Sequence, residues 1–256
     1  MVKNRFRNFY LVLTFLFLYA PIIVLIVYSF NDSKLRGQWG GFTLKWYAEL
    51  FKDREVMAAL YHTLLVAVLT TIISTITGVF AAMGLSNFSK RARNTILNFN
   101  YIPVLNPDIV TAVSLMVLYG VLKLKFGLFT MLLSHIAFTI PYVVLSVLPK
   151  LKQMNRHLPE AAMDLGATPF QAFTKVVLPE IMPGIVTGAM LAFTLSIDDF
   201  VISFFTTGHG VANISTTVFS MARRGINPII NALSTLMFLT MLILLVLINK
   251  KTKEEE

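Results

Sequence analysis

Three aspartates lie within long apolar stretches of this sequence: Asp108, Asp198 and Asp199. In a membrane-spanning segment a carboxylate costs roughly 2.5–3.5 kcal/mol on insertion scales and by default indicates a functional site. The same stretches contain no Lys or Arg that would neutralise these charges. We therefore expect the carboxylates to form a pathway for cations, in which spaced charges attract a polycation without a single overly deep site. The alternative is a structural role, through hydrogen bonds to neighbouring helices or as a buried, protonated carboxyl.

Other polar residues accompany the aspartate pair at helical spacing. Ser196, Asp199, Ser203 and Thr206 follow i, i+3, i+7 and i+10, which predicts one polar stripe along a continuous helix. Asp198 points about 100° away from that stripe, so the two carboxylates need not share a face.

Asp108 follows residues that favour a break in its helix. On a continuous helix it would lie roughly 18 Å from Ile96, near the middle of the membrane. Pro103 and the sequence Asn106-Pro107 just before it predict instead a helix that restarts within the membrane. Broken helices at this depth are expected where the backbone lines a cavity.

Trp46 stands in the aromatic sequence Phe42-Thr-Leu-Lys-Trp-Tyr47, between the first two apolar stretches. Its ring has two possible roles. It could anchor the chain at the membrane interface, or its face could receive an ammonium group at the outer mouth, with an attraction of about 0.5–2 kcal/mol.

The elements that position these residues must be membrane helices. Of the 256 residues 56% are hydrophobic and 14% are charged, against about 45–50% and about 25% in soluble domains. This composition excludes a soluble enzyme and a disordered chain, and the absence of cysteine excludes a disulfide scaffold. Six stretches reach the length of about 20 residues that a spanning helix needs. They are Phe9–Phe30, Tyr61–Asn87, Ile96–Gly120, Phe126–Leu148, Ile181–Thr207 and Pro228–Asn249. The sequence therefore predicts an all-α integral membrane protein with six transmembrane helices.

Basic residues indicate the orientation of these helices. The segments that would share a side with the termini contain 13 Lys and Arg residues, and the alternate loops contain nine. The positive-inside rule therefore places both termini in the cytoplasm of a multi-pass protein of the cell membrane. The formal charge of +9 lies mainly in these short loops, which indicates contact with anionic lipid headgroups and not with nucleic acid.

The sequence lacks motifs for several kinds of chemistry. It contains no Gly-Lys pair and hence no phosphate-binding P-loop. The four histidines are widely scattered, so no metal site is expected, and no nucleophile elbow occurs. Energy for any uphill transport must therefore come from a partner protein or an ion gradient.

The loop 149–180, predicted to be cytoplasmic, has the signals of two short helices. In the first, from Leu158 to Gly166, Pro159 and Glu160 suit the first turn and Gly166 suits a left-handed terminating position. Thr168 then predicts the cap of a second helix through Phe170, Phe173 and Val177, which Pro179 and Pro183 close before the next span.

The same loop resembles the EAA loop of ABC importer permeases. Glu160-Ala161-Ala162, Gly166 and Val176-x-Leu178-Pro179 match the spacing of that motif, with Val176 in place of isoleucine. The resemblance implies the type I permease fold, as one domain over residues 1–256. It also implies that the first short helix is a coupling helix, which docks on a separate ATPase subunit with Glu160 as anchor.

Further stretches resemble the spermidine/putrescine branch of these permeases. They are Gly41–Tyr47, Asn106-Pro-Asp-Ile109, Ser134-His135 with Pro141-Tyr142, and Leu195-Ser-Ile-Asp-Asp199. The resemblance implies a subunit that is not itself an enzyme and holds no cofactor. It would form a heterodimer with a second permease, bind two ATPase subunits that hold ATP and Mg²⁺, and receive substrate from an extracytoplasmic polyamine-binding protein.

On this interpretation the substrate pathway contains Trp46, Asp108, Ser196, Asp198 and Asp199. Three other functions remain open at this point. The chain could be an ABC permease for another small solute, a stand-alone proton-coupled cation carrier or channel, or a membrane scaffold that recruits an ATPase.

Overall fold

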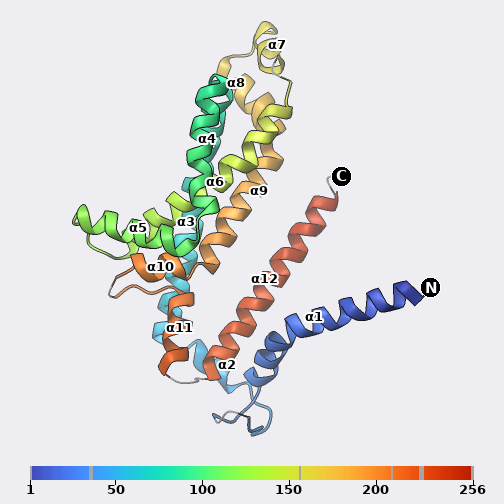
Figure 1. Cartoon of the computed structure of the whole chain (residues 1–256), viewed down its shortest axis with the longest axis vertical. Coiled ribbons are helices and arrows are strands. Elements are labelled where there is room, and N and C mark those ends of the chain that lie inside the picture. Colours follow the sequence, from blue (N-terminus) through green and yellow to red (C-terminus); the bar gives the residue numbers. More distant parts are fainter. Residues whose placement is uncertain (1, 35–36, 156, 209, 225–227, 255–256) are drawn as a thin grey trace. The chain divides into compact units, whose positions relative to one another are not determined.

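The computed structural model describes residues 2–34, 37–155, 157–208, 210–224 and 228–254. The chain forms two compact units, one of Met1–Met57 with Thr217–Glu256 and the other of Ala58–Thr216. In the described residues the regular structure is helical, apart from an isolated bridge between Asn31 and Phe42 (Figure 1). The prediction of an all-α membrane protein is thereby confirmed.

The first unit contains α1 (Val2–Ser29), α2 (Lys45–Leu50) and α12 (Pro228–Glu254). α12 packs against both α1 and α2. The apolar side chains of α1 between Phe9 and Val27 are largely exposed, as expected for a helix whose surroundings are lipid or other membrane helices. α3 (Arg54–Asn87) and α11 (Ile214–Arg224) each contribute residues to both units.

The second unit is built around α6 (Leu128–Gln153) and α9 (Leu178–Asp198), which pack along each other. α3 joins them in a core that includes Val79, Val143, Val147 and Ile181. Glycines permit the close approach of these helices, as small residues do in membrane bundles. Gly188 of α9 lies against Val143 of α6, where an added Cβ atom would come within 3.1 Å of the Val143 Cα atom.

Shorter helices complete the second unit. α4 (Lys90–Leu105) and α5 (Asp108–Val121) precede α6, and α7 (Leu158–Asp164), α8 (Pro169–Ala172) and a π-helical turn η1 (Phe173–Val177) precede α9. α10 (Val201–Thr206) follows α9 and packs against α5 and α6. Within this unit α7 and α8 lie at one end of the long helices, whereas α5 and α10 lie far from that end (Figure 1).

Four described helices are long and apolar enough to cross a membrane, and α4 with α5 makes a fifth if the bent pair is one span. α12 has a shorter described apolar stretch, from Pro228 to Thr240. The number of six spans therefore stays a prediction.

Two of the predicted spans are broken in the structure. The stretch Ile96–Gly120 consists of α4 and α5, which meet at a bend of 105°. The break lies at Asn106 and Pro107, where the sequence predicted that the helix restarts. The stretch Ile181–Thr207 was predicted to be one helix, but α9 ends at Asp198 and α10 begins at Val201. Asp199 has extended backbone there, because its side chain binds the first N–H groups of α10.

The prediction that prolines close the second helix of the loop 149–180 is wrong. Helix continues from Pro169 through η1 into α9, with Pro179 in the first turn of α9 and Pro183 inside it. In η1 the N–H of Leu178 bonds to the carbonyl of Phe173, five residues earlier. This wider turn changes the carbonyl positions just before Pro179, whose ring would clash in a regular α-helix. The helix can therefore pass the proline without ending.

Candidate functional site

The break between α9 and α10 contains the adjacent aspartates, and their side chains have different surroundings. The Asp199 side chain is 7% exposed. Its Oδ1 atom accepts a hydrogen bond from the N–H of Ile202 at 3.1 Å, and its Oδ2 atom accepts one from the N–H of Ser203 at 2.7 Å. Asp199, one residue before the N-cap position Phe200, therefore satisfies free N–H groups in the first turn of α10, and its carboxylate interacts favourably with the helix dipole.

α6 brings a histidine to this cap. The Nε2 atom of His135 lies 3.3 Å from Oδ2 of Asp199 and 2.9 Å from Oγ of Ser203, and Nδ1 lies 2.7 Å from Oγ of Ser196. The imidazole is 1% exposed. His135 thus connects the last turns of α9 with the first turn of α10. It also contacts the carboxylate of Asp199, whose own apolar stretch contains no Lys or Arg that could neutralise it.

Asn213, which precedes α11, also contacts these residues. Its Nδ2 atom donates to the carbonyl of Asp199 at 2.9 Å and to Oγ of Ser203 at 2.8 Å. Two reciprocal hydrogen bonds fix the position of Asn213. The N–H of Thr216 donates to Oδ1 of Asn213, and the N–H of Asn213 donates to the hydroxyl of Thr216. We call His135, Ser196, Asp199, Ser203 and Asn213 the buried polar group.

Asp198 lies outside this group. It is the last residue of α9, is exposed, and forms no ion pair with the lysines and arginines that the structure describes. Asp108 is also exposed, in the first turn of α5. A carboxylate is unfavourable against lipid, so both positions fit a surface that faces water, a substrate or a protein partner.

The predicted polar stripe is thus assembled by contacts across the break in the helix. Ser196, Asp199 and Ser203 meet at His135, although they do not lie on one continuous helix. Thr206 is separate from them, since its carbonyl accepts from the hydroxyl of Thr130 and its hydroxyl donates to Ile202. Which of these residues contact a substrate stays a prediction.

Trp46 is buried in the first unit, with 1% of the residue exposed. Its Nε1–H donates to the carbonyl of Asn31 at 2.7 Å, and the Nζ atom of Lys45 lies 4.5 Å from the ring centroid. Lys45 also forms an ion pair with Asp32. Both predicted roles of Trp46 need an accessible ring, whereas in this structure a lysine of the same chain already occupies the place of a bound ammonium.

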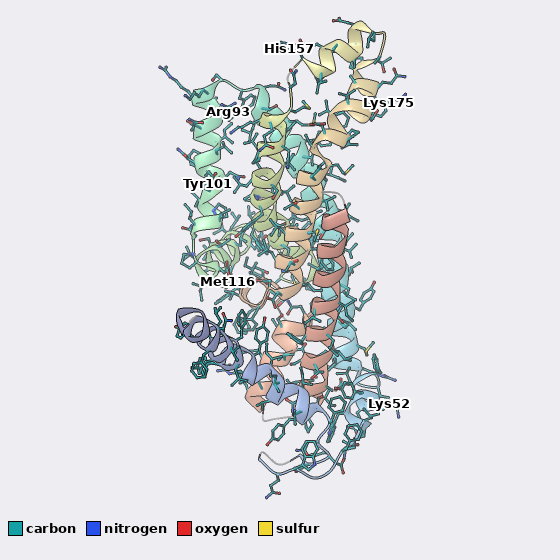
Figure 2. All side chains as sticks on the ribbon, turned by 90° about the vertical axis from the view of Figure 1, so that its right-hand side faces the viewer. Lys52, Arg93, Tyr101, Met116, His157 and Lys175 are labelled. Carbon is teal, nitrogen blue, oxygen red and sulfur yellow. The ribbon has the colours of Figure 1, made fainter. Side chains whose placement is uncertain are left out.

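The predicted coupling region forms an exposed projection at one end of the second unit. Figure 2 shows His157 and Lys175 at this end. α7 begins with Pro159 in its first turn and ends before Gly166, whose φ of 92° is the predicted left-handed conformation. The side chain of Thr168 caps α8 as the sequence predicted.

The surface of this projection combines charge with apolar side chains. Glu160 is exposed and lies 3.1 Å from Nδ1 of His157. Leu165 is 91% exposed and Phe170 is 73% exposed. Ala161, Gly166 and Pro179 are exposed as well, and Ala162 and Leu178 are partly exposed. Such a short helix with free apolar residues is suited to bind in a groove of another protein.

No group of three or more His, Asp or Glu in the described part of the chain is placed to hold a metal ion. Three residues of the buried polar group, His135, Ser203 and Asn213, were not among the residues predicted for the substrate pathway, although Ser203 belonged to the predicted polar stripe. The four scattered histidines gave no sign of such a contact, because it joins residues 61 to 68 positions apart in the sequence. The signal available was the lack of any cation within the aspartate stretch, which indicated that another element must supply the partner.

Comparison with known proteins identifies close relatives. Residues 74–250 match the family described as binding-protein-dependent transport system inner membrane component. The putrescine transport system permease protein PotI of Escherichia coli K12 is 40% identical over 92% of this chain and 86% of its own length. The spermidine/putrescine transport system permease protein PotC of the same strain is 36% identical, over 96% of this chain and 93% of its own. The PotC protein of Haemophilus influenzae is 34% identical, over 96% of both chains.

Solved structures show the same fold. A chain of a bacterial ABC transporter that imports the acidic polysaccharide alginate superposes with a TM-score of 0.71 at 18% identity, over 99% of this chain and 98% of that one. A chain from an amino acid ABC transporter with histidines superposes with a TM-score of 0.59 at 18% identity, over 82% of this chain and 100% of that one.

Proposed function

Since this chain belongs to the binding-protein-dependent transport system inner membrane components, we propose that it imports polyamines as the permease subunit of an ATP-driven transporter. The resemblance to ABC importer permeases in the sequence is confirmed by this membership. The family consists of transport subunits and not of enzymes. The observation that carries the proposed substrate is the similarity to two polyamine permeases over more than nine-tenths of the chain.

The chemistry of the site supports a polyamine as substrate. Asp108 and Asp198 are exposed on helices that consist mainly of apolar residues. A linear polyamine carries two or three ammonium groups separated by methylene chains, so separate carboxylates within an apolar lining complement both parts of it. The same carboxylates would not favour an anionic substrate such as alginate, although the fold is shared with an alginate transporter.

We further propose the assembly and direction of this transporter. A second, similar permease forms the other half of the pathway, and a polyamine-binding protein delivers substrate from outside. The complex contains two ATPase subunits, one of which binds the projection around α7 of this chain. Both termini then lie in the cytoplasm, and ATP with its Mg²⁺ is bound by the ATPase subunits. Movement of α7 transmits the closure of the ATPase pair to the membrane helices as a rigid-body displacement.

Uptake of labelled putrescine and spermidine tests the proposal. We expect cells that lack this chain to lose uptake, and its restoration with the partner subunits to recover it. ATP depletion should stop uptake, whereas a proton uncoupler at maintained ATP should leave it unchanged. No recovery, with the complex shown to be assembled, would exclude polyamines and leave an ABC permease for another solute. Uptake that needs the proton gradient alone would indicate a proton-coupled carrier.

A further inference from the structure

Asp198 lies between two residues that contact the same imidazole ring. Ser196, two residues before it, is within 2.7 Å of Nδ1 of His135, and Asp199, directly after it, is within 3.3 Å of Nε2. The ring therefore fixes the chain on both sides of Asp198 while the Asp198 side chain itself stays exposed. With its neighbours held, the position of the Asp198 Cα atom and the direction of its Cα–Cβ bond are fixed, which limits where the carboxylate can lie.

Asp199 is not available as a second ligand in this structure. Both of its carboxylate oxygens accept N–H groups of α10, and the side chain is almost fully buried. Its backbone is held too, because the amide of Asn213 donates to the Asp199 carbonyl at 2.9 Å. A substrate would have to reach a carboxylate that is buried and already shared by two N–H groups of α10, whereas the Asp198 side chain is exposed.

We propose that His135 is a positioning residue for substrate binding, which acts through Ser196 and Asp199 to hold Asp198 in the orientation that contacts an ammonium group. This inference rests on the proposed polyamine transport. Asp199 then belongs to the support of the site, and Asp198 supplies the charge at the break. Positional precision matters here because an ion pair gains little from a carboxylate that is free to turn toward water.

A double-mutant cycle tests the proposal in the purified transporter complex reconstituted in liposomes with ATP. The variants are His135→Gln, Asp198→Asn and the two combined, and the measurement is putrescine uptake as a function of concentration. We expect each single change to raise the half-saturating concentration about fivefold to tenfold, with a smaller change in maximal rate. The double variant should be no worse than Asp198→Asn alone, since His135 acts through that residue. Fold-changes that multiply would overturn the proposal.

Tyr119→Phe is the matched control. It removes a buried side-chain hydrogen bond of 2.9 Å to Ser134, the neighbour of His135 on α6, without touching the buried polar group. We expect its half-saturating concentration to equal that of the wild type. An increase like that of His135→Gln would show that any buried polar loss near α6 has this effect, and would also overturn the proposal. If His135→Gln does not assemble, Ser196→Ala removes one of the two contacts and replaces it in the cycle.

A second measurement does not depend on the substrate. The chain has no cysteine, so Asp198→Cys provides a single thiol at the break. Its rate of modification by a small thiol reagent should change severalfold when His135→Gln is added and should not change with Tyr119→Phe. If the wild type does not transport polyamines but the rate changes in this way, the proposed function fails and the positioning role stands. An unchanged rate would refute the positioning role, whichever substrate is transported.

Discussion

Asp108 begins α5 with an exposed carboxylate, directly after the break at Asn106 and Pro107. If it contributes to polyamine attraction, Asp108→Asn should raise the half-saturating concentration about fivefold, the loss expected when one exposed ion pair of about 1 kcal/mol is removed. Asparagine keeps the shape and removes only the charge. Asp108→Glu restores the charge and should recover most of the affinity. Equal loss in both variants, measured at equal amounts of assembled complex, would indicate a steric role in α5 instead.

Gly166 ends α7 with a φ of 92°, a conformation that L-residues other than glycine adopt at a cost of about 1–2 kcal/mol. An added Cβ atom would meet no other atom within 4 Å, so backbone strain is the only effect of Gly166→Ala. We expect this variant to shift the equilibrium position of α7 and to reduce the ATP hydrolysis stimulated by loaded binding protein severalfold.

Gly84→Ala is the control for this change, because Gly84 also has open space around it but lies within α3 without a left-handed φ. It should leave stimulated ATP hydrolysis at the wild-type rate. The assignment of α7 as the coupling element would be contradicted if Gly166→Ala hydrolysed ATP and transported substrate normally.

At the scale of elements, the close contact of α3 with α6 depends on a glycine, Gly78, whose lack of a side chain leaves room for Val143. A Cβ atom on Gly78 would come within 2.6 Å of Cγ1 of Val143, so Gly78→Ala forces the helices apart or a rotamer to change. Such overpacking costs typically about 1–3 kcal/mol. We expect Gly78→Ala to lower the melting temperature of the purified complex. Gly84→Ala, six residues further along the same helix, should leave it unchanged. Equal stability of the two variants would show that α3 and α6 are not packed as the structure has them.

The sequence predicted the helical class and the helix restart before Asp108, because apolar length and proline position act locally. It also predicted the left-handed Gly166 and the cap at Thr168, whose causes lie within four residues. It did not predict the end of α9 at Asp198, because the cap that favours this end competes with helix continuation and is supported by His135 and Asn213, distant in sequence. The passage of the helix past Pro179 was missed because a π-helical turn has no clear sequence signal.

The buried position of Trp46 likewise depends on tertiary contacts. An aromatic residue between apolar stretches is typical of the membrane interface. The sequence alone could not show that the carbonyl of Asn31 accepts the indole N–H of Trp46 and that the ammonium of Lys45 lies over its ring. The exposure of Asp198 and the burial of Asp199 could not be assigned for the same reason. Two identical side chains at adjacent positions are distinguished only by which of them the neighbouring helix contacts.

At the scale of the whole molecule, the bent pair of α4 and α5 determines how many times the chain crosses the membrane. If the pair is one span, the loop that contains Lys125 lies on the outer side, together with the loop that contains Lys52. If the pair is re-entrant, Lys125 lies on the same side as Arg91, between α3 and α4. The two topologies therefore assign opposite sides to one exposed residue.

Because the chain lacks cysteine, single substitutions by cysteine report the side of each loop without background. We expect a membrane-impermeant maleimide to label Lys52→Cys and Lys125→Cys in cells whose inner membrane is intact. Arg91→Cys and Leu165→Cys should be labelled only after that membrane is permeabilised. Lys125→Cys that behaves like Arg91→Cys would make the α4–α5 pair re-entrant and, with Leu165 then on the side of Lys52, would contradict a cytoplasmic position of α7. Both the coupling role of α7 and the cytoplasmic orientation predicted from the basic residues therefore require that the α4–α5 pair crosses the membrane.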